Sequence, residues 1–216
     1  MVAGASPGRD RPYSSTKRQE QARHTRRRIL AAATERFCTL GYAGTTMSAV
    51  AAAAGVAVPT VELAFSTKVS LLKAVIDVAI AGDDEPVPVL ERPWASSAEA
   101  AATAERFLAE VADTLVAAAE RSDALVLAAF EAARSDDRLA PLAAQLKAQR
   151  AVTAAWIVDG IAARTSLRVD RAQAIDTIWL LMDPAVFDRL TTDRAWSTHS
   201  YGAWFTDSAL RLLTEQ

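Results

Sequence analysis

The chain has 216 residues, of which 51% are hydrophobic, with only eight glycines and eight prolines. This length can bury a substantial core, and the abundance of Ala and Leu favours helix over strand. No apolar run reaches the roughly 20 residues that a membrane-spanning helix needs, and the basic N-terminus lacks the apolar segment of a signal peptide. We therefore expect a cytoplasmic protein with no membrane partner.

The formal net charge is −2, but it is unevenly distributed. Residues 1–28 carry eight basic and two acidic groups, residues 29–82 are neutral overall, and residues 83–216 carry an excess of eight acidic groups. A basic end suits a polyanion such as nucleic acid. A solubilising tail would show the same charge, so charge alone leaves both interpretations open.

The first part of the chain predicts a short arm followed by four helices. Residues 1–16 mix Gly, Pro, Ser and Arg without periodicity, which is typical of a disordered arm. A helix is expected from about Lys17 to Gly41, because apolar residues recur at helical period: Ile29, Ala33, Phe37 and Leu40. Two short helices and a longer one should follow. Thr46 caps the first short helix and Gly55 ends it, and Pro59 lies in the first turn of the second. The longer helix begins at Lys68 and runs to about Gly82.

Three prolines in residues 83–95 predict a domain boundary, and the pattern beyond it is again helical. Ser96 and Glu99 form a candidate capping box for a helix that reaches about residue 121. Further helices are expected at about 123–134, 138–165, 170–183 and 198–214, and Asp170 with Gln173 caps the helix at 170–183. No strand alternation is visible. The predicted fold is all-α, with an N-terminal domain over 17–82 and a helical domain over 96–216.

Short helices joined by tight turns within about 50 residues predict a helix-turn-helix unit. The second helix of such a unit lies in the major groove, with aliphatic side chains on its buried face and short groups on its exposed face. The expected buried residues are Val56, Val61 and Phe65. Helix starts offer free N–H groups to phosphate, and Thr46 and Lys68 each lie at such a start.

Residues 29–75 resemble the DNA-binding domain of the tetracycline-repressor (TetR) family of transcriptional regulators. The matching positions are Phe37, Gly41-Tyr42, Thr45-Thr46, Ala51, Ala54-Gly55-Val56, Thr60, Phe65, Lys68 and Leu71-Leu72. The resemblance implies a homodimer, usually a repressor, that binds a pseudo-palindromic site in double-stranded DNA. It also implies a small-molecule effector in the C-terminal domain and a dimer bundle formed by the helices at about 170–183 and 198–214.

The resemblance assigns DNA contacts by position. Contacts near the start of the first helix fall to Thr46, Met47 and Ser48, and those in the groove to Val58, Pro59, Thr60, Glu62, Leu63 and Ala64, with Lys68 reaching a phosphate. Most family members carry a tyrosine where this chain has Glu62, and Ala57 replaces the usual capping serine. Glu62 either accepts from a cytosine amino group or only avoids the phosphates. The arginine-rich segment 18–28, including Arg23, Arg26 and Arg27, is expected to compensate through phosphate or minor-groove contacts.

Apolar residues of the C-terminal domain are candidates for an effector site: Phe107, Phe130, Trp156, Trp179 and Met182. Each taken singly is more often a core residue. Tyr201, Trp204 and Phe205 are assigned to packing or to the dimer interface. No Cys or His cluster has metal-ligand spacing, and no phosphate loop or nucleophile elbow is visible, so we expect no metal, no cofactor and no enzymatic activity. The competing hypothesis is a ligand-binding or protein-interaction dimer whose head has weakened or lost DNA binding, as Glu62, Ala57 and Ala64 suggest.

Overall fold

The computed structural model describes residues 12–215, and within that range it contains helices and no strand. The prediction of an all-α fold is confirmed. The α-helices are α1 (Pro12–Gly44), α2 (Met47–Ala54), α3 (Val58–Phe65), α4 (Lys68–Ala81), α5 (Pro93–Glu99), α6 (Ala104–Ala132), α7 (Ala140–Ala162), α8 (Arg171–Leu181), α9 (Pro184–Asp188) and α10 (Thr198–Leu213). Short 3₁₀ turns lie at Val89–Glu91 and Asp137–Leu139, and a π turn lies at Arg189–Asp193.

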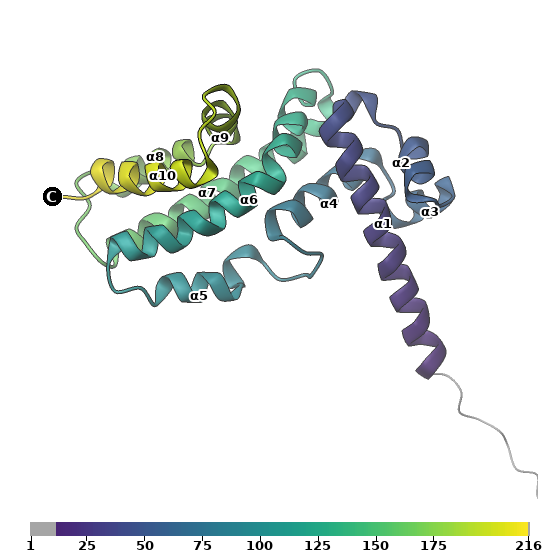
Figure 1. Cartoon of the computed structure of the whole chain (residues 1–216), viewed down its shortest axis with the longest axis horizontal. Coiled ribbons are helices and arrows are strands. Elements are labelled where there is room, and N and C mark those ends of the chain that lie inside the picture. Colours follow the sequence, from purple (N-terminus) through teal and green to yellow (C-terminus); the bar gives the residue numbers. More distant parts are fainter. Residues whose placement is uncertain (1–11, 216) are drawn as a thin grey trace, which may run out of the picture.

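The molecule is elongated, with α1–α4 at one end and α5, α8 and α10 at the other (Figure 1). The long helices α6 and α7 connect the two ends, and the N-terminal half of α1 projects away from the body (Figure 1). No single helix in the described range is both long enough and apolar enough to cross a membrane. Only α2 and α3 taken together reach that apolar length, and they are bent by 111°.

Helix α1 is longer than expected. It begins at Pro12, so residues 12–16 of the expected arm are helical, while residues 1–11 lie outside the described residues. Gly41 interrupts the helical path with φ 65° and ψ −177°, which is where the sequence placed the end of the helix. Leu40 was expected on the buried face and is instead 52% exposed.

The first hydrophobic core joins the N-terminal helices to the long helices of the body. Phe37, Val61 and Leu72 from α1, α3 and α4 belong to the same buried cluster as Leu125 of α6 and Leu142 of α7. The proline-rich link therefore separates two stretches of sequence without separating their cores. Helices α1 and α4 pack on α6, and α2 and α3 contact α1 and α4 in turn.

The second core lies at the other end of the body, where the first half of α6 packs with α5, α7, α8 and α10. Helix α6 spans both cores as one helix of 29 residues, so the expected division into helices at 96–121 and 123–134 was wrong. No Gly or Pro interrupts 104–132. The capping box at Ser96 and Glu99 was also wrong: both residues lie in α5, and Thr103 caps α6 by accepting from the N–H of Arg106 at 3.3 Å.

Candidate nucleic-acid interface and effector cavity

Helices α2 and α3 meet at 111°, joined by the three residues 55–57. This is the geometry of a helix-turn-helix, whose helices cross at about 90–120° over a short turn. Gly55 ends α2 in the left-handed conformation, with φ 62°. A Cβ at this position would lie 2.7 Å from Nη2 of Arg28, which is the end of a flexible side chain, so it is the left-handed backbone conformation that favours glycine here.

The start of α2 is capped as the sequence predicted. Thr46 Oγ1 accepts from the N–H of Ala49 at 3.1 Å, and the Thr46 side chain is exposed. The neighbouring Thr45 is fully buried, and its hydroxyl donates to the carbonyl of Gly41 at 2.8 Å. The two threonines therefore have different roles: Thr45 fixes the turn, and Thr46 leaves the first N–H groups of α2 facing solvent.

Helix α3 divides into the two faces that the sequence predicted. Val61 and Phe65 are buried, whereas Leu63 is 89% exposed and Pro59 and Glu62 are also exposed. Val58 and Thr60 of the same helix are half-buried. The N-cap residue, Ala57, makes no side-chain hydrogen bond. Its outward face is thus short and mainly apolar, which suits close contact with a groove.

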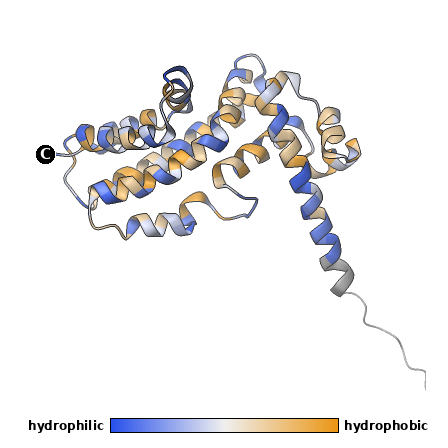
Figure 2. Ribbon diagram, viewed as in Figure 1, coloured by the Kyte–Doolittle hydropathy of each residue, from blue (hydrophilic) through white to orange (hydrophobic). Residues whose placement is uncertain are grey.

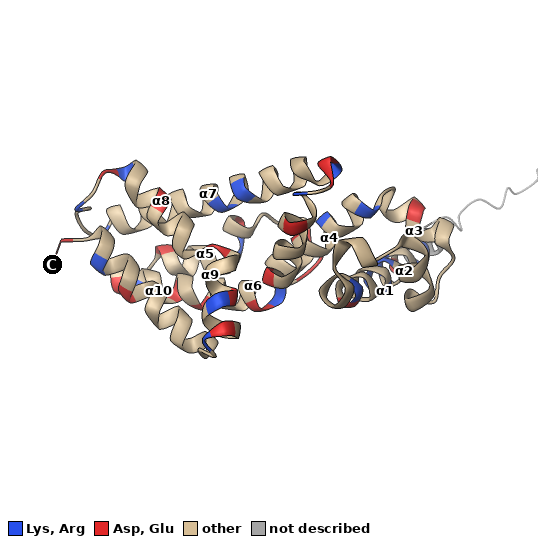
Figure 3. Cartoon of the chain, turned by 90° about the horizontal axis from the view of Figure 1, so that it is seen from above, with Lys and Arg blue, Asp and Glu red and all other residues tan. Residues whose placement is uncertain are grey.

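Charge is distributed unevenly over this end of the molecule. Residues 47–65 contain a single charged residue, Glu62, and Figure 3 shows an acidic segment and no basic one on α3. The Glu62 carboxylate forms no salt bridge with any described residue. The positive charge lies instead on α1, whose residues 17–28 carry six basic groups and one acidic group. The projecting part of α1 is strongly hydrophilic, and α2 and α3 are largely hydrophobic (Figure 2).

The arginines at 26–28 make contacts within the chain that sequence reasoning missed. The Arg26 guanidinium lies 4.6 Å from the centre of the Phe65 ring. Arg28 donates to the carbonyls of Ala54 and Gly55, at the end of α2. These two arginines therefore join α1 to the end of α3 and to the end of α2. Arg23, nearer the start of α1, is exposed.

Arg27 instead connects α1 to the proline-rich link, through an ion pair with Asp84 at 3.4 Å. The Arg27 side chain is 68% exposed, so this pair contributes little to stability. The ion pair joins the basic helix α1 to the proline-rich link, and Asp84 of that link lines a cavity.

Lys68 has a structural role that the sequence did not indicate. Its Nζ donates to the carbonyls of Tyr42 and Thr45, both at 2.9 Å, and lies 3.9 Å from the centre of the Tyr42 ring. Burial is the main cause that lowers the pKa of this ammonium group. Lys68 thus joins the end of α1 to the start of α4 and keeps one N–H for a further partner.

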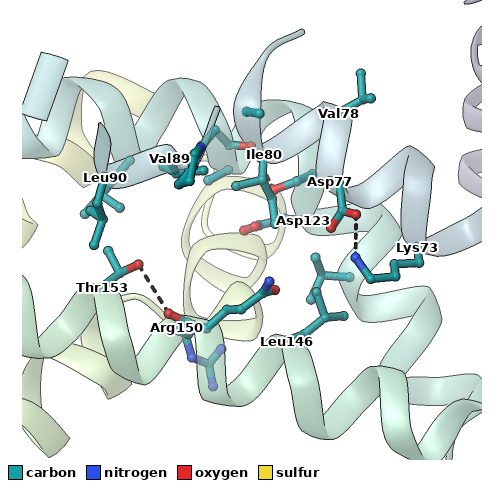
Figure 4. A pocket seen from close by; sticks show the side chains of 18 of the residues that line it. Lys73, Asp77, Val78, Ile80, Val89, Leu90, Asp123, Leu146, Arg150 and Thr153 are labelled. Atoms are coloured by element: carbon teal, nitrogen blue, oxygen red, sulfur yellow. Dashed lines mark hydrogen bonds and ion pairs between the residues drawn. The ribbon is translucent and has the colours of Figure 1, made fainter. Parts of the chain in front are cut away.

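A cavity of about 830 Å³ lies between α4, the link 83–91, α6 and α7, next to the start of α9 (Figure 4). Its apolar lining includes Leu115, Val126, Phe130, Leu146, Met182 and Phe187. The link is held in place by Arg92, which donates to both oxygens of Asp83 at 2.7 and 2.9 Å. These hydrogen bonds are the main reason that the pKa of Asp83 is lowered to about 2.

Only part of the expected effector-binding set lines this cavity. Phe130 and Met182 do. Phe107 is fully buried in the second core, and Trp156 packs edge-on against Trp94 at 5.4 Å, where it borders a separate shallow groove. Trp179 lies behind the cavity wall, under the Arg150 guanidinium at 3.9 Å. Helical periodicity identifies inward-facing residues, but it does not tell which of two interior spaces each one faces.

Arg150, Tyr201 and Asp123 are three of the polar side chains that line the cavity. Arg150 pairs with Asp183 at 2.7 Å. Tyr201 donates to the carbonyl of Leu181 at 2.7 Å, and burial raises the pKa of its phenol. Burial raises the pKa of Asp123 to about 8; the carboxylates of Asp183 and Asp188 add to this effect and Arg150 opposes it. Sequence reasoning missed Asp123 altogether.

The residues assigned to the dimer interface lie mostly inside the chain itself. Tyr201 and Phe205 are 4% and 1% exposed, and Trp204 is half-buried against Tyr201, with ring centres 5.7 Å apart. Their aromatic character indicated burial, but it did not distinguish burial within one chain from burial between two. The resemblance assigns the dimer bundle to the helices that correspond to α8 and α10. Their large exposed apolar residues are Leu180 of α8 and Leu212 of α10.

Comparison with protein families identifies the N-terminal part of the chain. Residues 29–75 match the family described as bacterial regulatory proteins, tetR family. Residues 29–75 form a TetR-family domain. The match covers the same residues as the sequence resemblance, and the family that it names is one of regulatory proteins. A search of curated proteins finds no match.

Solved structures extend the likeness to the C-terminal helices. A protein from Rhodococcus sp. described as a TetR-family transcriptional regulator superposes with a TM-score of 0.67 at 18% identity, over 88% of this chain and 99% of that one. The regulator FadR from Bacillus subtilis, in complex with stearoyl-CoA, gives 0.67 at 20% identity, over 86% and 97%. A protein from Saccharomonospora viridis described as a transcriptional regulator, in complex with choline, gives 0.65 at 16% identity, over 88% and 98%. The chain thus has the fold of TetR-family regulators.

Proposed function

We propose that this protein is a homodimeric transcriptional repressor that acts in the cytoplasm, binds a pseudo-palindromic DNA site through α2 and α3, and responds to a small molecule in the cavity. The observation that carries the proposal is the outward face of α3. Its side chains are displayed to solvent although they are largely apolar, while the opposite face is buried in the first core. An apolar face left exposed on a helix-turn-helix is suited to a DNA groove.

The chemistry of this face favours readout by short apolar contacts. Pro59 and Leu63 are suited to thymine methyl groups, and Thr60 can reach a base edge. Glu62 is the one charged group on the face and has no salt-bridge partner among the described residues, so it is free to accept from the amino group of a cytosine. A dimer would place two such helices about one helical turn apart or more.

Affinity for the phosphate backbone would come from α1 and from helix starts. Lys17, Arg18 and Arg23 lie on the projecting part of α1 and are exposed. The free N–H groups at the start of α2 can bind one further phosphate. Binding is therefore expected to weaken steeply with salt, since each phosphate contact releases condensed counterions.

The cavity is placed to influence the DNA-binding head. Its lining includes Arg26 of α1 and Lys73 of α4, and also Asp84, the partner of Arg27. A molecule in the cavity would therefore touch α1, α4 and the link at once, and these are the elements that carry the helix-turn-helix. The related folds solved in complex with choline and with stearoyl-CoA support the proposal of a small-molecule effector.

The test is selection of a binding site from random double-stranded DNA with the purified full-length chain. We expect an inverted repeat to be enriched. The variant Glu62→Gln should then relax selection at one base position in each half-site if Glu62 reads a cytosine, and Glu62→Tyr should lower affinity there. If Glu62→Tyr instead raises affinity for every sequence alike, the carboxylate only repels phosphate. Glu35→Gln, an exposed change on α1, is the matched control.

The alternative function is that of a ligand-binding or protein-interaction dimer with the same fold, in which the helix-turn-helix has weakened or lost its binding to DNA. The uncapped start of α3 at Ala57 and the acidic Glu62 favour it. Failure of the selection to enrich any sequence, together with no measurable binding to random DNA even at low salt, would favour this alternative and overturn the repressor.

A further inference from the structure

Asp123 is an unusual residue for its position. It lies in the middle of α6, where aspartate is a poor helix former, and it lines the cavity, in the centre of the view in Figure 4. Its Oδ2 is buried and has no hydrogen-bond partner among the described residues. A buried carboxyl oxygen without a partner costs free energy, so its presence in a cavity points to a partner that comes from outside the chain.

The cations around the cavity are engaged elsewhere. Six acidic side chains line it against three basic ones. Each basic group already has a partner other than Asp123: Lys73 lies 2.6 Å from Asp77, Arg150 lies 2.7 Å from Asp183, and Arg26 lies over the ring of Phe65. Asp77, Asp83 and Asp84 are likewise paired, with Lys73, Arg92 and Arg27, so Asp123 is one of the lining carboxyl groups that have no ion-pair partner among the described residues.

The walls around this carboxyl group are apolar and aromatic. Leu115, Phe130, Met182 and Phe187 line the same space. The volume of about 830 Å³ falls within the roughly 300–1,000 Å³ that is usual for sites of drug-sized molecules. Aromatic rings are favourable neighbours for an organic cation as well as for an apolar body.

We propose that the cavity binds a small amphipathic cation, an amine or ammonium group on an apolar body, whose charged group pairs with the carboxylate of Asp123. The inference rests on the proposed function only in taking the cavity as the effector site. It adds the chemical class of the effector and the residue that selects its charge.

Proton linkage provides a second, independent signature. The carboxyl group of Asp123, with a pKa of about 8, is mainly protonated at pH 7 in the free protein. A cation pairs with the ionised form, so its binding releases a proton and its affinity rises about tenfold per pH unit up to about pH 8. The charged and titratable groups around Asp123 are Arg150 on α7, Asp183 and Asp188 at the two ends of α9, Tyr201 on α10, and the Lys73–Asp77 pair on α4.

The experiment is isothermal titration calorimetry of the full-length protein with three probes that share one apolar body: 4-phenylbutylamine, 4-phenyl-1-butanol and 4-phenylbutyrate. The amine should bind at least about tenfold more tightly than the alcohol or the acid. In Asp123→Asn this preference should be lost while affinity for the alcohol is unchanged. Asp113→Asn, an exposed carboxylate on the same helix, should behave as wild type.

The proposal is overturned if the amine does not bind, or if all three probes bind with equal affinity. Titrations of wild-type protein in phosphate and in Tris at pH 7 test it without any variant: they should show release of close to one proton per amine, and no release contradicts it. DNA binding measured on the same preparation separates the two proposals. DNA binding without amine binding removes only this inference, whereas amine binding without DNA binding removes the repressor and keeps the cation site.

Discussion

Replacing Asp123 by Asn is expected to stabilise the protein, and to do so increasingly as the pH rises. Folding raises the pKa of this carboxyl group from 3.8 to about 8. Below pH 4 both the folded and the unfolded chain hold the proton, so wild type has its full stability there. Between pH 4 and 8 only the folded chain holds it, so the unfolded state is favoured progressively.

The magnitude follows from the size of this shift. Each pKa unit corresponds to about 1.4 kcal/mol, so the shift sets an upper limit of about 5 kcal/mol lost from wild type by pH 8. Relaxation of the folded chain reduces this figure. The buried amide of Asn carries its own desolvation cost of about 1–3 kcal/mol, but this cost is the same at every pH and does not affect the change with pH. We therefore expect Asp123→Asn to gain about 2 kcal/mol on wild type between pH 5 and pH 8.

Urea unfolding at pH 5, 6, 7 and 8 measures this gain directly. Wild type and the control Asp113→Asn should lose stability in parallel over this range, and Asp123→Asn should lose less. Above pH 8 the difference should stay constant. A difference that is the same at every pH, or one that shrinks as the pH rises, would refute the reasoning that Asp123 is buried without a compensating partner.

Two side chains that bridge elements give further predictions. Tyr201→Phe removes the hydrogen bond to the buried carbonyl of Leu181 and should lower the free energy of unfolding by about 1–2 kcal/mol, measured by urea unfolding; an unchanged value would mean that this bond contributes nothing. Lys68→Met keeps the aliphatic stem but removes two hydrogen bonds, to Tyr42 and Thr45, and should cost about 2 kcal/mol; thermal unfolding with no change in midpoint would contradict the structural role.

The helix-turn-helix could be predicted from the sequence because its signals act over a single turn. Thr46 as an N-cap, Gly55 as a left-handed stop and Pro59 in a first turn each depend on a few neighbouring residues. Thr45 was noticed only as a motif position, and Lys68 was expected to reach a phosphate. The bonds of Lys68 within the chain were not predicted, because the carbonyls of Tyr42 and Thr45 are brought near it by tertiary folding.

The C-terminal helices could be predicted in number only approximately. The segment around Ser122 and Asp123 was predicted to separate two helices, but it lies within α6, the helix that spans both cores. The signal that could have identified Asp123 was present in the sequence. Ala119 and Val126, four residues before it and three after, place this carboxyl group on a nonpolar helical face. Which interior space that face borders could not be predicted, because it depends on how α6 packs against α4 and α7.

The central claim is that the outward face of α3 reads DNA, and Leu63→Asp tests it most directly. Leu63 is 89% exposed, so the change should alter the free energy of unfolding by no more than about 0.5 kcal/mol. It would, however, place a second carboxylate next to Glu62 on the groove-facing side. Ala144→Asp adds the same charge on the exposed face of α7 and is the control.

The measurement is the ratio of affinities for the selected site and for a scrambled duplex, by fluorescence anisotropy at fixed salt. Wild type and Ala144→Asp should prefer the selected site by at least about a thousandfold. Leu63→Asp should lose most of that preference while it remains folded. Wild-type affinity and preference retained in Leu63→Asp would contradict the account.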